Sequence, residues 1–196
     1  PKEELTNFRA IGSRLQGHPD MNKAPGIDFS AGSLGQGVSA ACGMALAGKL
    51  GHKDSGVYTI LGDGEIEEGQ VWEAAMFADH YKLDNLCFII DNNDLQIDGR
   101  VGEVSSPYPI DEKFRAFGFE VFCCDGHDFA ALEETFQKVL KVTGKPAAII
   151  AKTIKGKGVS YMEDQVGWHG KAPNDEEYKI AMDELNAQLA ELEAQV

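Results

Sequence analysis

The sequence has no apolar run that approaches the about 20 residues of a membrane helix, and it begins without a signal-peptide pattern. Positive charge is scarce, because 18 Lys and Arg residues stand against 32 Asp and Glu residues, a formal net charge of −14. Phosphate backbones attract basic surfaces, so this balance argues against nucleic acid as a partner. We expect neither a nucleic acid nor a membrane as partner. An anionic ligand would need a metal ion or a helix N-terminus beside it.

Cysteine is also scarce. Cys42, Cys87, Cys123 and Cys124 form no CxxC pair, and all four lie in apolar stretches. We expect buried, reduced thiols, including the adjacent Cys123 and Cys124, in a cytoplasmic protein. What the chain does have is 196 residues, 43% of them hydrophobic, which is enough for one α/β domain with a substantial core.

Short apolar runs alternate along the chain with stretches of helical period. The apolar runs predict buried strands at 57–61, 85–90, 119–124 and 146–154. The periodic stretches predict helices at 39–50, 69–82, 110–118 and 129–144. Continuous apolar strands that alternate with helices are typical of a parallel sheet covered by helices on both faces. We therefore expect one α/β domain over residues 1–196.

A long helix is predicted over 174–196, where Asn174 and Glu177 have the spacing of a capping box. We expect its apolar stripe to pack on the same domain; a surface for a partner is the alternative. The stripe consists of Tyr178, Met182, Leu185, Leu189 and Leu192.

Two acidic stretches, LGDGEIEEGQ (61–70) and DNNDLQIDG (91–99), each follow or end an expected strand. In an open α/β sheet, ligands bind outside the carboxyl ends of the strands. At these ends Asp63 offers a carboxylate, Asn93 an amide oxygen and Leu95 a backbone carbonyl. Such an oxygen-only set suits Mg²⁺ or Ca²⁺, with water and phosphate oxygens completing the coordination shell.

Glycines flank this carboxylate. Gly62 and Gly64 let a ligand approach the backbone closely, and Gly64 could present its N–H to a phosphate. GDG alone and an Asn-rich stretch alone are each common turns. Occurring together, after two strands separated by a helix, they favour a metal-assisted phosphate site. The stretch from Asp91 is a poor EF-hand, because Gln96 replaces the required glycine, and the sequence has no GxxxxGK[ST] P-loop.

The two stretches resemble the thiamine diphosphate motif, which is GDG followed one helix and one strand later by NN. The surrounding segments GHPD (17–20), SAGSLGQGVSAACGMALA (30–47), LQIDG (95–99) and WHGKAPN (168–174) are similar, in that order, to motifs of the transketolase family. The resemblance covers nearly the whole chain. The ending KTIKGKGVSYMEDQVGWHGKAPN (152–174) looks most like the N-terminal subunit of split transketolases.

This resemblance implies a thiamine diphosphate-binding fold and a transferase of the pentose phosphate pathway. Such an enzyme moves a two-carbon ketol group from a ketose phosphate to an aldose phosphate. It also implies a partner, the C-terminal subunit that carries the pyrimidine-binding domain. A homodimer of this chain would then form part of a heterotetramer.

The family's cofactor-binding positions carry over one by one. Asp63, Asn93 and the carbonyl of Leu95 match the ligands of Mg²⁺ or Ca²⁺, and Gly64 matches the diphosphate-binding glycine. Ile97 matches an apolar residue of the cofactor pocket. The loop that lies against the cofactor is matched by Gly32, Ser33 and Leu34.

The resemblance also implies catalytic residues. His18 matches a histidine near the reacting carbon. His169 matches a second histidine that reaches both the diphosphate and the donor sugar. Glu68 matches a glutamate at the subunit interface, close to the partner's catalytic glutamate. The histidines left as surface or structural residues are His52, His80 and His127, and the lysines expected in a solvated loop are Lys152, Lys155 and Lys157.

The sequence departs from the family pattern at both ends. The upstream segment with its GH motif and substrate-contacting histidine is not found, so we expect the chain to lack an N-terminal segment. The downstream domains hold the glutamate that activates the aminopyrimidine and the residues that bind the sugar phosphate. We therefore expect activity only with the partner subunit, and weak or no cofactor binding by this chain alone.

Three alternatives stay open. Another thiamine diphosphate enzyme, such as a deoxyxylulose-phosphate synthase or a 2-oxo acid dehydrogenase E1 subunit, would share the motif, although WHGKAP and GHPD favour transketolase. A non-catalytic paralogue would keep the fold without the chemistry, and the intact His18 and His169 argue against it. A metal-dependent phosphate-binding module without thiamine is the third.

Overall fold

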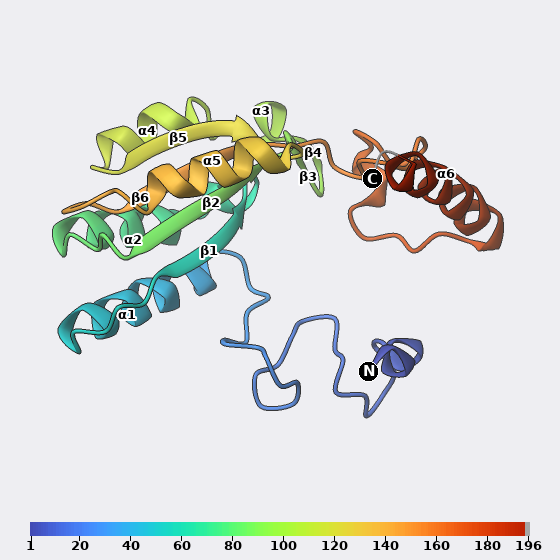
Figure 1. Cartoon of the computed structure of the whole chain (residues 1–196), viewed down its shortest axis with the longest axis horizontal. Coiled ribbons are helices and arrows are strands. Elements are labelled where there is room, and N and C mark those ends of the chain that lie inside the picture. The colour runs from blue at the N-terminus through green and yellow to red at the C-terminus, as the bar shows by residue number, and fades with distance from the viewer. Residues whose placement is uncertain (195–196) are drawn as a thin grey trace.

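The computed structural model describes residues 1–194; the last two residues of the predicted C-terminal helix, 195–196, lie outside the described residues. Four parallel strands form the sheet in the order β1-β2-β6-β5 (Figure 1). A separate antiparallel pair forms a hairpin. The strands are β1 (Val57–Gly62), β2 (Leu86–Asn92), β3 (Leu95–Gln96), β4 (Gly99–Arg100), β5 (Glu120–Asp125) and β6 (Ala147–Lys152).

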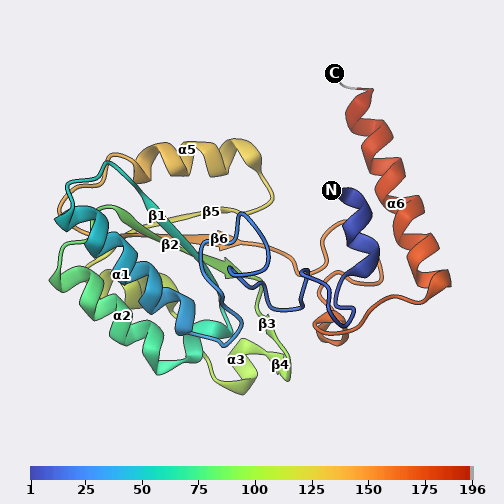
Figure 2. The same ribbon diagram turned by 90° about the horizontal axis from the view of Figure 1, so that it is seen from below.

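Helices cover the sheet unequally. One face carries α1, α2 and α4, and the opposite face carries α5 (Figure 2). The predicted α/β class with a parallel sheet between helices is confirmed. The helices are α1 (Gln36–Leu50), α2 (Gly69–His80), α3 (Val101–Val104), α4 (Ile110–Ala116), α5 (Phe129–Val139) and α6 (Asp175–Glu193), with 3₁₀ turns η1 (Lys2–Asn7), η2 (Glu65–Glu67) and η3 (Val166–Trp168).

An aromatic cluster fills the core between the sheet and the face carrying α1, α2 and α4. Phe88 of β2 is fully buried, and its ring centroid lies 5.0 Å from that of Phe119 and 6.1 Å from that of Phe114. Trp72 of α2 packs on Phe114 at 5.1 Å. These contacts join α2, α4 and the sheet into one unit, which sets the positions of the strand ends.

The other face of the sheet is covered only in part. Residues of α5 pack on Cys87 and Ile149 in a smaller core. At the β1 edge, however, Tyr58 is 48% exposed and Ile60 is 72% exposed. The expectation of helices on both faces therefore holds for the central strands, while the far face of the edge strand is open.

The expectation that all four thiols are buried was wrong. Cys123 is exposed and Cys124 is half-buried, because they lie on β5, the other edge of the sheet. Cys42 and Cys87 are buried as expected. The β3-β4 hairpin and α3 were not predicted, since strands of two residues and a helix of four residues are too short to show a period.

Helix α6 begins with the predicted capping box, in which Asn174 accepts a hydrogen bond from the N–H of Glu177 and the Glu177 side chain accepts one from the N–H of Asn174. The predicted packing of its apolar stripe on this domain was wrong. Every member of that stripe is at least 36% exposed. The reason is that α6 meets its own chain mainly through polar contacts, from Glu184 to Ser160 and from Gln188 to the carbonyl of Gly158.

We call residues 155–194 the C-terminal lobe. Figures 1 and 2 show it beside the carboxyl ends of the strands and apart from the helices that cover the sheet. In the part of the chain that the structure describes, no helix is both long and apolar enough to cross a membrane.

The aromatic core gives a first prediction. Replacing the fully buried Phe88 by alanine leaves a cavity between β2 and α4, and we expect a loss of about 3–5 kcal/mol in the free energy of unfolding. Phe129→Ala on α5 is the matched control, because that ring is 88% exposed. Urea denaturation of both variants measures the difference. Equal losses in the two variants would contradict this description of the core.

Candidate functional site

An open cleft of about 620 Å³ lies at the carboxyl ends of β1 and β2. Its walls come from the loop before α1, the GDG turn after β1, the segment after β2 with the β3-β4 hairpin, and the C-terminal lobe. The residues singled out from the sequence that line the cleft are Gly32, Leu34, Asp63, Gly64, Glu68, Asn93, Leu95, Ile97 and His169. Segments distant in sequence thus meet where the polar strand ends predicted a ligand site.

Two predicted residues lie outside this lining. Ser33 sits between two lining residues in the loop before α1. His18 packs against Gly32, where a Cβ added to that glycine would meet the imidazole ring at 2.6 Å. The glycine therefore lets the loop before α1 approach His18 closely.

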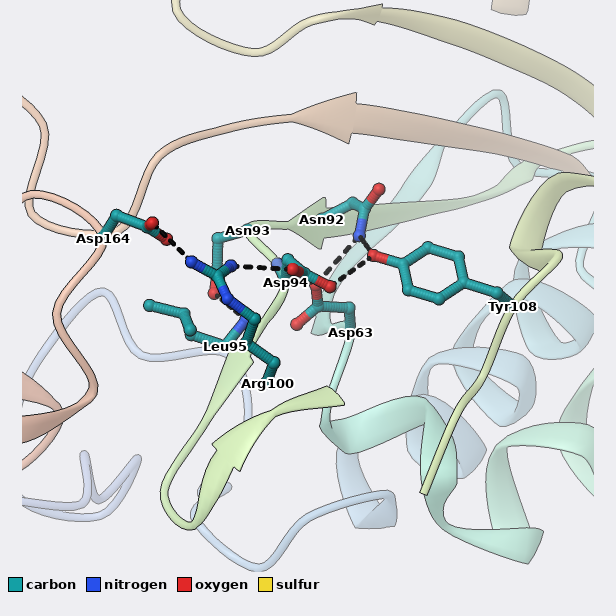
Figure 3. Close-up of polar contacts among 8 residues, drawn as sticks. All are labelled: Asp63, Asn92, Asn93, Asp94, Leu95, Arg100, Tyr108 and Asp164. Carbon is teal, nitrogen blue, oxygen red and sulfur yellow. Dashed lines mark hydrogen bonds and ion pairs between the residues drawn. The ribbon is translucent and has the colours of Figure 1, made fainter. Parts of the chain in front are cut away.

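Asp63 occupies the centre of the site and is 1% exposed (Figure 3). Its Oδ2 accepts hydrogen bonds from the Asn92 amide at 2.9 Å and from the Asp94 N–H at 2.5 Å. Its Oδ1 accepts one from the Gly64 N–H at 3.0 Å. The carboxylate is therefore fixed in orientation by neutral donors from two strand ends.

Burial raises the pKa of Asp63 above its ordinary value, because an ionised carboxylate loses its hydration there. Among residues 1–194 no Lys, Arg or His forms an ion pair with it. A buried carboxylate held by neutral donors alone is a strong site for a cation, since burial without a counter-charge is costly. The donor set of this site thus fits a hard divalent ion.

The other proposed ligands are close by. Asn93 is 8% exposed, and its Oδ1 accepts a hydrogen bond from the Leu95 N–H at 3.1 Å, which folds the chain after β2 into a tight turn. One lone pair of that oxygen stays available. In residues 1–194 no group of three or more His, Cys, Asp or Glu side chains could hold a metal. The predicted ligands, Asp63, Asn93 and the carbonyl of Leu95, form a different kind of site, because they include only one carboxylate.

Gly64 forms a narrow part of the cleft. A Cβ on this residue would lie 2.7 Å from the Cβ of Gln96 in the hairpin, which is closer than non-bonded carbon atoms approach. Nearby, Glu65 accepts hydrogen bonds from the N–H groups of Gly35 and Gly62, at 2.9 and 3.2 Å. This side chain ties the loop before α1 to the GDG turn, so one carboxylate joins two of the segments that form the cleft walls.

Sequence reasoning missed several residues that support the site. Asn92 holds Asp63, and it also contacts the Tyr108 hydroxyl at 2.9 Å. Tyr108 donates to Asp94 at 3.1 Å, and Arg100 binds the other oxygen of Asp94 at 2.8 Å. The DNN motif offered a signal for Asn92, because it stands next to Asn93 at the end of β2. No sequence signal pointed to Tyr108 or Arg100, since their roles depend on the fold.

Lys155 was also assigned wrongly. It lines the cleft together with His169, whereas Lys157 is exposed in a turn as expected. Lys152 is also exposed, but it ends strand β6 instead of lying in a loop. Lys155 adds a positive charge to a cleft that is otherwise rich in carboxylates. That charge would favour an anionic ligand.

Comparison with known proteins identifies the domain. The family described as "Transketolase, thiamine diphosphate binding domain" matches residues 1–191. A 6-deoxy-6-sulfo-D-fructose transketolase subunit of Clostridium sp. strain MSTE9 is 43% identical over 190 residues, which are 97% of this chain and 69% of that protein. The chain belongs to the transketolase family.

Other relatives agree. One of the subunits of the apulose-4-phosphate transketolase of Phocaeicola vulgatus is 42% identical over 192 residues, which are 98% of this chain and 68% of the relative. The crystal structure of transketolase from Campylobacter jejuni superimposes with a TM-score of 0.87 at 36% identity. The superposition covers 92% of this chain and 29% of the Campylobacter jejuni chain. The chain therefore spans about two thirds of the related transketolase subunits and under a third of the solved transketolase chain.

Glu67, another carboxylate of this transketolase domain, gives a pH prediction. Its Oε1 is covered and has no hydrogen-bond partner in residues 1–194. Burial, with the charges of Asp63 and Glu68, raises the pKa of Glu67 above its ordinary value of 4.5. Ionisation therefore costs more in the folded than in the unfolded chain, and this residue's contribution to stability is lost as the pH rises through the raised pKa.

We expect Glu67→Gln to become increasingly stable relative to the unsubstituted chain between pH 4 and pH 7. The measurement is the urea midpoint at several pH values. Glu133→Gln, at an exposed position on α5, is the control and should show a constant difference. A constant difference for Glu67→Gln as well would show that Glu67 is not strained by burial.

Proposed function

We propose that this chain is the cofactor-anchoring subunit of a split, thiamine diphosphate-dependent transketolase. The observation that carries the proposal is the buried Asp63, held by neutral donors at the end of β1 and lining a cleft shared with Asn93, Leu95 and His169. A divalent ion would neutralise that carboxylate and attract a diphosphate. The positive charge of Lys155 on the cleft wall would also favour an anionic ligand.

Each residue has a proposed task. Asp63, Asn93 and the carbonyl of Leu95 would hold Mg²⁺, or Ca²⁺ in its place. Gly64 would let the diphosphate approach the backbone, and Ile97, which is 65% exposed on the hairpin, would contact the cofactor rings. The loop before α1 would lie against the cofactor through Gly32, Ser33 and Leu34.

When bound, thiamine diphosphate supplies an electron sink for the two-carbon fragment. This chain would orient the reactants and move protons. His169, on the cleft wall, would serve the diphosphate and the donor sugar, and His18, against Gly32, would serve the substrate hydroxyls, since an imidazole can donate and accept hydrogen bonds and transfer protons. Glu68, also on the wall, would face the partner's catalytic glutamate.

We propose a ketose phosphate as donor and an aldose phosphate as acceptor. The relatives are named for different sugars, 6-deoxy-6-sulfo-D-fructose and apulose 4-phosphate, at 43% and 42% identity. Overall identity therefore does not select one donor. The residues that distinguish sugars are expected largely in the second subunit, and a place in the pentose phosphate pathway is part of the same proposal.

We also propose that a separate C-terminal subunit completes the site, in a heterotetramer built on a dimer of this chain. Support comes from relatives named as subunits and from the exposed apolar rim of the cleft, where Leu34 is 57% exposed. A reducing, cytoplasmic location fits the free thiols of all four cysteines.

The other thiamine diphosphate enzymes and a non-catalytic paralogue are the competing functions. The enzymatic activity of this chain mixed with its C-terminal subunit distinguishes these functions from the proposed transketolase. A ketose phosphate donor should be consumed in the presence of an aldose phosphate acceptor, whereas pyruvate should not be decarboxylated. A paralogue without chemistry would bind the cofactor and consume neither.

A binding experiment tests the shared site. Thiamine diphosphate with Mg²⁺ is titrated calorimetrically into this chain, into its C-terminal subunit and into the mixture. We expect strong binding in the mixture only, because this chain supplies half of the site. Asp63→Asn should abolish the Mg²⁺-dependent part of that binding, since an amide cannot supply the charge. Absence of binding in every sample would exclude the thiamine function.

Gly64 offers a second test. The residue has an ordinary right-handed backbone, so alanine is disfavoured there only by the 2.7 Å approach to Gln96. We expect Gly64→Ala to displace the hairpin, at a cost to folding of about 1–3 kcal/mol, and thereby to weaken cofactor binding. Gly43→Ala in α1 is the control, because a Cβ there meets nothing within 4 Å. Equal affinities in the two variants would show that the close approach at Gly64 is unimportant.

A further inference from the structure

The C-terminal lobe, residues 155–194, contributes Lys155 and His169 to the cleft, yet it is weakly joined to the sheet. Thr153 and Ile154, just before the lobe, bond to Asp91, Asn92 and His127. Beyond them, among the described residues, one side-chain contact joins the lobe to residues 1–152 by a hydrogen bond or ion pair. That contact is the pair between Arg100 and Asp164, at 2.6 Å.

Arg100 binds two carboxylates at once. One guanidinium nitrogen lies 2.8 Å from Oδ2 of Asp94, and another lies 2.6 Å from Oδ2 of Asp164 (Figure 3). The planar fork of arginine suits this bridging, which a lysine ammonium reproduces poorly. Without the guanidinium, the two carboxylates would face each other and repel.

Both partners of Arg100 have backbones in the left-handed region, with φ of 67° at Asp94 and 56° at Asp164. Non-glycine residues adopt this region only when their surroundings hold them there, and Asp and Asn tolerate it best. Every polar group of Asp94 is engaged. Its N–H donates to Asp63, its carbonyl accepts from Val101, and its two carboxylate oxygens accept from Tyr108 and Arg100.

The contacts form a continuous path from the end of β1 to the C-terminal lobe. It runs from the buried carboxylate of Asp63 through Asp94 and Arg100 to Asp164. The N–H of Asp164 then donates to the carbonyl of Lys155 at 3.0 Å, which fixes that cleft residue. His169 follows Asp164 closely in the chain and lines the same cleft.

We propose that Arg100 is a positioning residue of the cofactor cleft, which places the lobe carrying Lys155 and His169 against the strand-end loop that carries the metal ligands. The proposal rests on the proposed function. The pair is partly exposed, with side-chain exposures of 43% for Arg100 and 51% for Asp164. Such pairs add little to global stability, so the effect of Arg100 is on geometry.

The test uses Arg100→Gln, Asp164→Asn and the double variant. Asn keeps the shape and the left-handed tolerance of Asp164 and removes only its charge. Arg115→Gln is the matched control, because Arg115 makes an exposed ion pair within α4, away from the cleft. Amide hydrogen exchange is measured on this chain alone, and thiamine diphosphate affinity with saturating Mg²⁺ is measured on the complex with the C-terminal subunit.

We expect both single variants to exchange faster over residues 155–169 and to bind the cofactor about tenfold more weakly, as for other residues that support a metal site. The double variant should be no weaker than Arg100→Gln, because both changes remove the same contact. The urea midpoint should stay unchanged in all variants, and Arg115→Gln should behave as the unsubstituted chain.

Two results would overturn the assignment while leaving the proposed function intact. One is normal affinity and normal exchange in Arg100→Gln. The other is a lowered urea midpoint with faster exchange throughout the sheet, which would make Arg100 a structural residue. Failure of the unsubstituted complex to bind thiamine diphosphate would instead overturn the proposed function, and the positioning role with it.

Discussion

Burial of the Asp63 carboxylate is the constraint on which the site depends. The side chain is 1% exposed and its pKa is raised by burial, yet its partners in residues 1–194 are neutral donors. A domain evolved for stability alone would gain by replacing such a group with an apolar one. Its retention at a strand end, beside a cleft, is what a cation-binding role would explain.

The sheet converts this local arrangement into a binding site. Parallel pairing of β1 with β2 places Gly62 opposite Asp91, so the GDG turn and the segment after β2 leave the sheet at the same level. The aromatic core around Phe88 fixes the helices that hold these ends apart. Because the frame is rigid, it holds the short loops that follow the strands, and these loops can carry the binding residues in fixed positions.

Several apolar surfaces are left open around this frame. They are the far face of β1 at Tyr58 and Ile60, the rim of the cleft at Leu34 and Ile97, and the stripe of α6. Contiguous exposed apolar surface commonly marks a place where proteins meet. The distribution fits the proposal of a subunit whose site is completed by another polypeptide, and the weakly joined lobe lies beside the carboxyl ends of the strands (Figure 2).

The sequence by itself determined the α/β class, the four long strands and the capping box of α6, because period and capping chemistry are local properties. It also determined which strand ends are polar, and so the neighbourhood of Asp63, Asn93 and Leu95. Only the tertiary structure decided that Lys155 faces the cleft, that the α6 stripe is exposed and that Arg100 reaches Asp164. These depend on contacts between residues far apart in the chain, such as 100 and 164, which no local pattern encodes.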